Sequence, residues 1–125
     1  MTRRSVSSGS PWEGPYGYSR ATVVGNMCWV AGTADPTGRH PGDAAGQARE
    51  VLGIIERALT EAGFSLTDVV RTRMYVTDAA DTDAVARVHG EVFGSVRPAS
   101  TIVAVSALIS PDLLVEIEAD AIRER

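Results

Sequence analysis

Two stretches of the sequence carry residue types that bind carboxylates and transfer protons, and in both they recur at every second position. Leu114–Ile122 alternates acidic with apolar residues, beginning with Glu116, and Val69–Thr77 places Arg71 and Arg73 in the same alternating way. A guanidinium binds a carboxylate through paired hydrogen bonds, and a carboxyl group is a common general acid or base. A polar face of this kind suits a wet interface between subunits, and it suits equally a solvated sheet face with cross-strand ion pairs. The residues expected on that face are Val24, Arg20, Trp29, Arg71, Arg73, Tyr75, Glu116 and Glu118.

The other chemically reactive residues form no further motif. His40 falls in a predicted loop and His89 in a predicted helix, without the spacing of metal ligands, so no metal site is expected. His89 is expected on the helix surface, and the alternative is that it approaches a pocket. Cys28 is the single cysteine and is expected to be a small buried residue. The glycines follow neither dinucleotide-binding nor phosphate-loop spacing, which argues against a nucleotide cofactor.

Two predicted helices would support these residues. The first spans residues 43–62, with Asp43 as a possible N-cap and Gly63 placed for a left-handed C-cap. The second spans residues 81–93, with Asp81 as a possible cap. The first helix has one apolar stripe, made by Ala48, Val51, Leu52, Ile55, Leu59 and Ala62.

Five strands complete the predicted order β-β-α-β-α-β-β, an α/β fold with one mixed sheet. Gly25-Asn26 is expected to join the first two strands as a type II′ turn. In the third strand, Val70 and Thr72 are expected to face the helices and Val69 to share the face of the arginines. Two helices can cover only one face of such a sheet. The predicted strands are Tyr18–Val24, Met27–Thr33, Val69–Thr77, Ser100–Ala107 and Leu114–Ile122.

Composition limits what kind of protein this is. The 125 residues suffice for one domain, predicted at 18–125 after an irregular arm at 1–17 that is rich in Ser, Gly and Pro. The net charge of −4 and pI of about 5.1 argue against nucleic acid as a partner, although Arg3 and Arg4 could form a local patch with Arg123 and Arg125. No secretory signal or membrane span is evident, so a cytoplasmic location is expected.

Several segments together resemble the reactive intermediate deaminase family, also called YjgF-like or L-PSP-like. The resemblance runs from residue 17 to the end of the chain, and its strongest parts are Arg97–Ala99 and the Val115–Ala119 strand. It implies a chorismate-mutase-like fold, a homotrimer, and three clefts that are each lined by two subunits. It also implies hydrolysis of enamines or imines, such as 2-aminoacrylate, to 2-oxo acids and ammonia without a cofactor. The segments are Gly17–Ala21, Gly25-Asn26, Ala31–Thr33, Gln47–Arg49, Asp68–Thr72, Arg97–Ala99 and Val115–Ala119.

One position departs from the family pattern. In the deaminating members an arginine that clamps the substrate carboxylate follows Arg-Pro-Ala, and here that position is Ser100. A hydroxyl cannot replace the two parallel hydrogen bonds of a guanidinium. Ser100 is therefore expected to line the cleft without acting as a nucleophile, since no base is adjacent in sequence. Arg71 or Arg73 could supply the missing charge, or could pair with Glu116 or Glu118.

The resemblance also assigns roles to other residues. Glu116 matches the family's pocket glutamate, which positions a water or passes a proton, and the alternative is a surface carboxylate. Tyr18 matches the pocket tyrosine, either as a hydrogen-bonding group or as a packed wall. Trp12 and Glu13 are expected to fold over the mouth of the cleft, or else to belong to a mobile tail.

Four functions remain in view from the sequence. The first is hydrolysis of an enamine or imine on a substrate for which 2-aminoacrylate is not the optimum. The second is a small-ligand-binding or regulatory trimer without turnover, and the missing clamp favours it. A ribonuclease is disfavoured by the acidic chain, which also lacks a paired histidine or lysine site. A chorismate mutase would rest on fold analogy alone.

Overall fold

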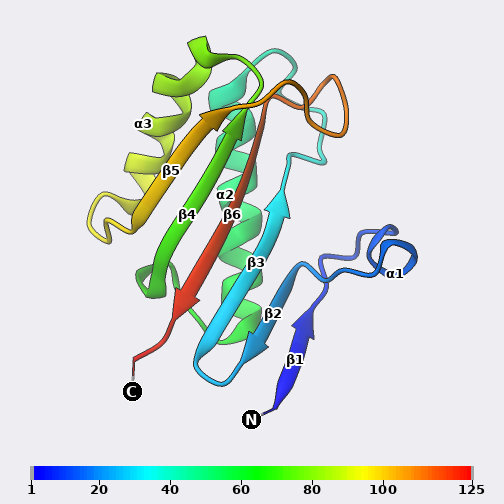
Figure 1. Cartoon of the computed structure of the whole chain (residues 1–125), viewed down its shortest axis with the longest axis vertical. Coiled ribbons are helices and arrows are strands. Elements are labelled where there is room, and N and C mark those ends of the chain that lie inside the picture. Colours follow the sequence, from blue (N-terminus) through cyan, green and yellow to red (C-terminus); the bar gives the residue numbers. More distant parts are fainter. Residues whose placement is uncertain (1, 125) are drawn as a thin grey trace.

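Six strands form one mixed sheet in the computed structural model, which describes residues 2–124 (Figure 1). The strand order is β1-β2-β3-β6-β4-β5; β4 and β5 are parallel and every other neighbouring pair is antiparallel. The α/β fold predicted from the sequence is confirmed. The strands are β1 Arg3–Val6, β2 Ala21–Val24, β3 Met27–Thr33, β4 Val69–Val76, β5 Ala99–Ala104 and β6 Val115–Ile122. The helices are α1 Glu13–Tyr16, α2 Ala44–Ala62 and α3 Thr82–Phe93, and the short 3-10 turns η1 Leu66–Asp68 and η2 Ala79–Asp81 flank β4.

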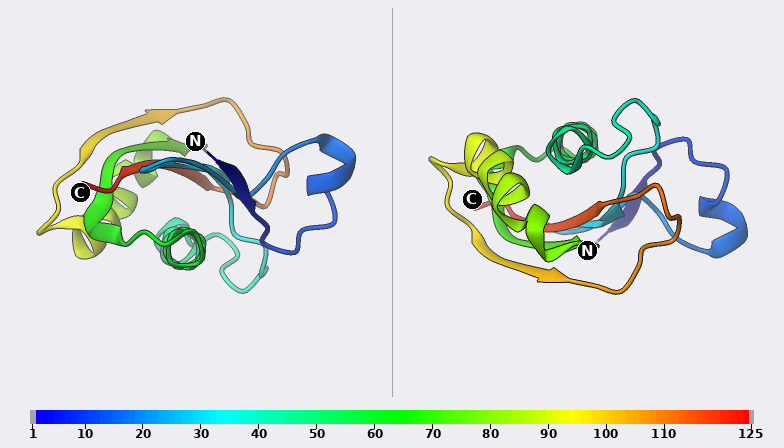
Figure 2. Two further views of the ribbon diagram at one scale, coloured as in Figure 1. Left: turned by 90° about the horizontal axis from the view of Figure 1, so that it is seen from below. Right: turned by 90° about the horizontal axis from the view of Figure 1, so that it is seen from above.

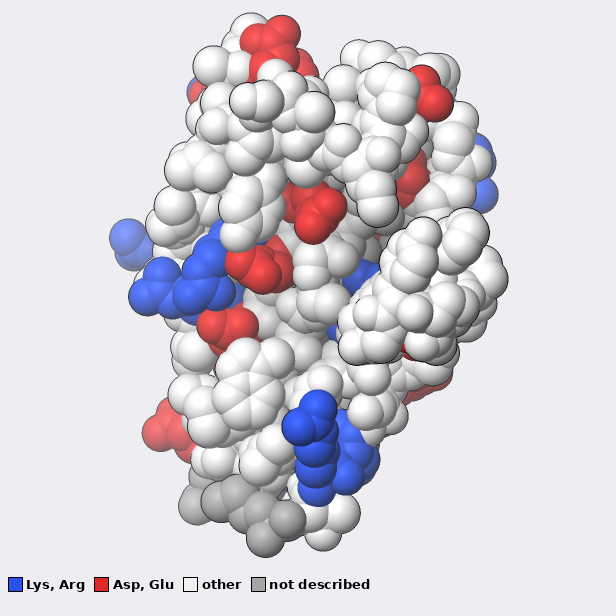
Figure 3. Space-filling view, turned by 45° about the vertical axis from the view of Figure 1, so that its right-hand side comes forward, with Lys and Arg blue, Asp and Glu red and all other residues white. Residues whose placement is uncertain are grey.

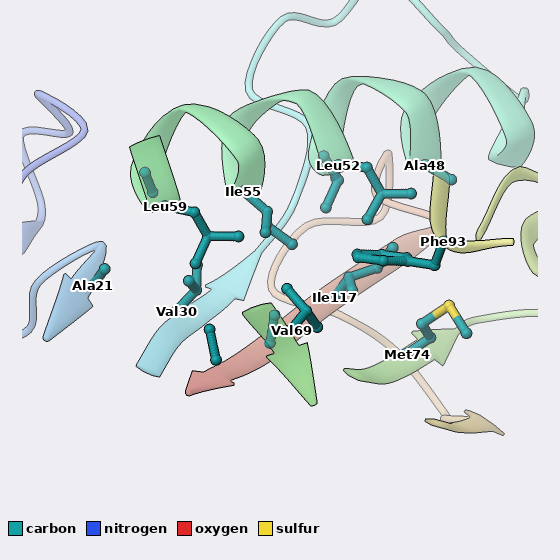
Figure 4. Packing of buried hydrophobic residues seen from close by; sticks show 14 of the residues in the cluster. Ala21, Val30, Ala48, Leu52, Ile55, Leu59, Val69, Met74, Phe93 and Ile117 are labelled. Atoms are coloured by element: carbon teal, nitrogen blue, oxygen red, sulfur yellow. The ribbon is translucent and has the colours of Figure 1, made fainter. Parts of the chain in front are cut away.

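The helix α2 forms where the apolar stripe predicted it. The Asp43 carboxylate accepts a hydrogen bond from the Gly46 amide at 2.9 Å, which satisfies one of the free donors of the first turn. Gly63 ends the helix with a φ of 86°, and its left-handed conformation turns the chain back toward the sheet. Figure 4 shows Ile55 and Leu59 pointing from α2 into the core.

The two long helices lie on one face of the sheet, as Figure 2 shows. Val115, Ile117 and Ala119 of β6 are buried beneath them, and Glu116 and Glu118 point to the other, open face. The alternation predicted for this strand is therefore confirmed. None of the helices within residues 2–124 has both the length and the apolarity that a membrane span requires.

The N-terminal arm contains regular structure that the sequence did not predict. Residues 1–17 were expected to be irregular, but Arg3–Val6 pairs with β2 as an edge strand and Glu13–Tyr16 forms a single helical turn. Val6 is the only buried residue of β1, so the strand has too little apolar pattern to be recognised alone. The Arg4 guanidinium donates a hydrogen bond to the Ala62 carbonyl at the end of α2, which fastens the strand to the helix layer.

Two local predictions were wrong. Val69 is buried and Val70 is exposed, the reverse of the expectation, because a β-bulge between Val69 and Arg71 shifts the pairing with β6. Asp81 precedes α3 but makes no side-chain capping bond there.

The predicted type II′ turn between β2 and β3 is consistent with the structure. Gly25 has a φ of 59°, while Asn26 has no positive φ.

Candidate functional site

An open hollow of about 790 Å³ lies on the face of the sheet away from the helices. The segment around α1 forms one wall, and β2, β3, β4 and β6 form the floor and the other wall. Acidic and basic side chains gather beside one another on the hollowed face in Figure 3. Its lining includes Glu13, Tyr18, Trp29, Arg73, Glu118 and Asp120. Three of the residues predicted for the site, Glu13, Tyr18 and Arg73, therefore share one depression.

Tyr18 stands at the entrance to β2, with its side chain partly open to solvent. Its ring lies 5.6 Å from the guanidinium of Arg20, which is a cation–π contact. Arg20 is buried and donates hydrogen bonds of 2.8 Å to the Gly32 carbonyl and the Thr33 hydroxyl. Arg20 thus packs against the Tyr18 ring, and the phenol lies at the rim of the hollow.

Glu116 projects from β6 toward β3 and fits closely over a glycine. A Cβ on Gly32 would lie only 2.3 Å from Oε2 of Glu116, so the absence of a side chain at residue 32 makes room for the carboxylate. Burial raises the pKa of Glu116, the neighbouring Glu118 raises it further, and Arg20 lowers it. A carboxyl group held in this way is easier to protonate than an exposed one, which suits general acid–base work. Glu116 is not among the residues that line the hollow.

Arg73 belongs to an ion-pair cluster across β4 and β6. Its Nη1 lies 3.4 Å from Asp120 and 3.8 Å from Glu118. The Tyr75 hydroxyl donates a 2.6 Å hydrogen bond to Glu118, and this bond is the main reason that the pKa of Tyr75 is raised. Arg73 is therefore engaged with acids in the single chain. Arg71 pairs in register with Asp120 but does not line the hollow.

The two predicted mouth residues differ in position. The Glu13 carboxylate accepts hydrogen bonds from the Ser8 amide at 3.0 Å and the Ser8 hydroxyl at 2.7 Å, and the hydroxyl contributes most to lowering the pKa of Glu13. Glu13 thereby ties the helical turn α1 to the segment after β1. Trp12 is 55% exposed, stacks on Tyr16 at 5.3 Å, and lies outside the lining of the hollow.

Ser100 lies on the opposite side of the sheet. It pairs with Thr72 in the parallel β4–β5 register and accepts a 2.8 Å hydrogen bond from the Thr72 hydroxyl. Thr72 Oγ1 is in turn 2.8 Å from Nε2 of His89 on α3. Glu116 pairs with Tyr75, three residues farther along β4 and on the open face, so one chain does not bring Ser100 and Glu116 together. Thr72 and His89 were missed because the parallel register that joins them to Ser100 has no local sequence signal.

The second histidine has a different setting. His40 Nε2 lies 3.1 Å from Glu50, which also pairs with Arg39 at 2.7 Å, at the start of α2. Within residues 2–124, no group of three or more His, Cys, Asp or Glu side chains gathers in a way that could hold a metal ion.

Comparisons with known proteins all indicate one family for this chain. The profile of the family "Endoribonuclease L-PSP" matches residues 13–123. The 3-aminoacrylate deaminase RutC of Acinetobacter baylyi is 39% identical over 104 residues, which cover 80% of this chain and 82% of that protein.

Two crystal structures show the same architecture. Rv2704 from Mycobacterium tuberculosis, described as a member of the YjgF/YER057c/UK114 family, is 50% identical with a TM-score of 0.91, over 98% of this chain and 100% of that one. TdcF of E. coli, solved with bound serine, is 27% identical with a TM-score of 0.79, over 97% of this chain and 94% of that one. Sequence profile, relatives and fold agree, and the chain belongs to the endoribonuclease L-PSP, or YjgF-like, family.

Proposed function

We propose that this protein hydrolyses an enamine or imine to a carbonyl compound and ammonia, in clefts between the subunits of a homotrimer. The observation that carries the proposal is Glu116, a half-buried carboxyl group with a raised pKa that fits over Gly32 at the open face. The relative named 3-aminoacrylate deaminase supports the same reaction class. An acid with a pKa nearer neutrality than that of a free glutamate can both give and take a proton during turnover.

The reaction needs a proton, a water and a bound substrate. Protonation of the enamine carbon gives an iminium ion, water adds to the C=N carbon, and the resulting carbinolamine releases ammonia and leaves a C=O group. Glu116 would handle the proton and position the water, and the Tyr18 hydroxyl at the rim would hydrogen-bond the substrate. The steps balance with water and a proton alone, and because the reaction changes no oxidation state it needs no redox cofactor.

A trimer would bring the separated residues of the site together. The open face carries half-exposed Trp29 beside the ion pairs of Arg73, and five of the six residues of the edge strand β5 are exposed. If β5 of one subunit lies against the open face of the next, Ser100 comes to the face that carries Glu116 and Tyr18 of its neighbour. Light scattering at micromolar concentration should give about three times the 13.2 kDa chain mass, and a stable monomer would contradict the proposal.

The matched pair Glu116→Gln and Glu118→Gln tests the catalytic role. Both residues lie on β6 and face the same way, but only Glu118 accepts the Tyr75 hydroxyl and pairs with Arg73. With an enamine generated in situ by a dehydratase, Glu116→Gln should slow release of the carbonyl product about 10²- to 10⁴-fold, the usual range for a general acid or base. Glu118→Gln removes a neighbour that raises the pKa of Glu116 but leaves the acid itself, so it should slow the release far less. Equal effects of the two changes would contradict the assignment.

A second candidate is a small-ligand-binding trimer without turnover. Ser100 at the family's clamp position favours it, because the charge that would hold a carboxylate is absent there. In that case calorimetry detects binding of 2-oxo or 2-amino acids, while no enamine tested is hydrolysed faster than in buffer. The acidic chain argues against a ribonuclease, since a polyanion would meet a net charge of −4.

A further inference from the structure

Three side chains from three elements form a hydrogen-bonded chain whose middle member is buried and whose one end is open to solvent. The Thr72 hydroxyl on β4 lies between Ser100 Oγ on β5 and His89 Nε2 on α3, at 2.8 Å from each. Thr72 is 0% exposed, His89 is half-buried, and Ser100 is open to solvent. The chain therefore ends in an accessible hydroxyl.

Packing fixes the geometry of this chain. The parallel register of β4 and β5 sets Ser100 directly beside Thr72, and the His89 ring packs against Phe93 with centroids 4.7 Å apart. A buried hydroxyl costs free energy unless it is hydrogen-bonded. The hydrogen bonds of Thr72 to Ser100 and His89 offset this cost.

The direction of donation leaves Ser100 with a free hydrogen. The Thr72 hydroxyl donates to Ser100 Oγ, so Thr72 Oγ1 is available to accept from the Nε2–H of His89. The hydrogen of Ser100 then points away from the chain toward solvent or a ligand. Hydrogen bonds in series polarise one another, so the last hydroxyl is a stronger donor than an isolated serine.

We propose that Ser100, Thr72 and His89 form an anion-binding relay, in which Ser100 donates to a carboxylate or oxyanion and protonation of His89 strengthens the capture. Ser100 touches the ligand, whereas Thr72 and His89 act through it as positioning residues. A neutral His89 has two tautomers, and only one has the Nε2–H. A protonated His89 must donate at Nε2 and adds a positive charge behind the relay.

The surroundings of His89 leave its charge free to respond to such a ligand. Burial alone lowers the pKa of His89 below its usual value of 6.5. On α3 Arg87 pairs with Asp83 at 2.8 Å, and Glu91 pairs with Arg49 of α2 at 3.2 Å. The charged groups on the elements that contact α3 are Arg49, Glu50, Glu56, Arg57 and Glu61 of α2, Asp81 of η2, and Arg71 and Arg73 of β4, whose Thr72 meets His89; β5 contributes none.

Thermodynamic linkage makes the relay measurable without any turnover. If an anion binds more tightly when His89 is protonated, the bound anion must raise the pKa of His89, and affinity must increase as pH falls through that pKa. That the ligand is a substrate-like carboxylate rests on the proposed function. The coupling between anion binding and protonation of His89 does not depend on it. Loss of enamine hydrolysis with intact coupling would refute the first proposal and leave the relay standing.

The test uses 2-oxobutanoate as the probe and the intact protein. NMR titration of the histidine ring protons should show a higher pKa for His89 in the presence of the probe. Calorimetry should show binding that tightens about five-fold or more between neutral pH and a pH below that pKa, the lower range of common coupling factors. Butanamide, which has no charge, should bind without this dependence.

Variants separate the relay from a merely structural contact. Thr72→Val should remove the coupling and Thr72→Ser should restore it, because only the second keeps a hydroxyl. His89→Gln keeps a possible donor but cannot titrate, so binding should persist without pH dependence. The control is His40→Gln, which changes the other histidine at its Glu50 contact and should leave the coupling unchanged.

Three results would overturn the relay. One is no binding of the probe at any pH. Another is binding with the same pKa of His89 in the free and bound protein. The third is undiminished coupling in folded Thr72→Val.

Discussion

Gly32→Ala should disable enamine hydrolysis and leave the chain folded, because the new methyl group would occupy space that the Glu116 carboxylate fills. A Cβ at residue 32 would lie 2.3 Å from Oε2 of Glu116 and 3.2 Å from its Cδ. Ordinary contact begins at 3.4 Å, so the carboxylate must retreat by about 1.1 Å. A displacement of about 1 Å in a catalytic group costs on the order of 10²-fold in rate.

Stability should change little, which separates this effect from unfolding. The clashing atom is the end of a flexible side chain, and Gly32 does not have the left-handed φ that alanine resists. Replacing glycine by alanine also restricts the unfolded chain, which is worth about 0.4–1 kcal/mol in favour of the folded state. The free energy of unfolding, measured in urea, should therefore shift by less than about 1 kcal/mol in either direction.

The control for Gly32→Ala is Gly53→Ala. Gly53 lies within α2, where a Cβ would meet only the Arg57 guanidinium at an ordinary 3.6 Å. That change should stabilise the helix by up to about 1 kcal/mol and leave hydrolysis unchanged. In a Glu116→Gln background, Gly32→Ala should cause little further loss, because both changes act on one group. Full activity in folded Gly32→Ala would show that hydrolysis does not depend on the position of the Glu116 carboxylate over Gly32.

Three further predictions concern the core, the clamp position and the arm. Ile55→Ala should lower the free energy of unfolding in urea by about 2–5 kcal/mol, because Ile55 is fully buried; a loss under about 0.5 kcal/mol would contradict that packing. Hydrolysis of 2-aminoacrylate should be weak, and Ser100→Arg should raise its rate several-fold and tighten the binding of 2-oxobutanoate. Adding Glu116→Ala to that variant should remove the gained rate but not the gained binding. A folded Ser100→Arg trimer with neither gain would favour the ligand-binding function. Glu13→Gln should lower the melting temperature at pH 7, and the deficit should disappear as pH falls from 4.5 through the lowered pKa of Glu13, since ionised Glu13 stabilises the fold by accepting from Ser8. A deficit that is the same at acidic and neutral pH would contradict this role for the carboxylate.

The parts of the fold that sequence could predict are those with a repeating apolar pattern. The stripe of α2 and the alternation of β6 depend on periods of 3.6 and 2 residues, and both are found as predicted. Val6 shows the limit of that signal, because a four-residue strand with one buried side chain has no period to detect. Val70 shows another limit, since a bulge inverts the alternation without a change in composition.

The candidate site was less predictable than the fold because it depends on register. Arg73 was predicted from the alternation of its strand and Tyr18 from the family resemblance, and the two share the hollow. The contact of Thr72 with Ser100 joins residues 28 positions apart through the parallel pairing of β4 and β5. The register of that pairing depends on the path of the connection through α3, which links β4 to β5. No local sequence pattern specifies this path.

Two arginines from opposite ends of the chain hold the same helix end. Arg4 donates to the Ala62 carbonyl, and Arg123 donates to the Gly63 carbonyl while its guanidinium lies 4.9 Å from the Phe64 ring. The last carbonyls of a helix normally fray first, because they have no partner within the helix. Here fraying must break contacts with β1 and with the segment after β6 as well, so the end of α2 and the two outermost segments should open as one cooperative unit in hydrogen exchange. Shortening the chain at either end would then loosen amide protection in the last turn of a helix some 60 residues away in sequence.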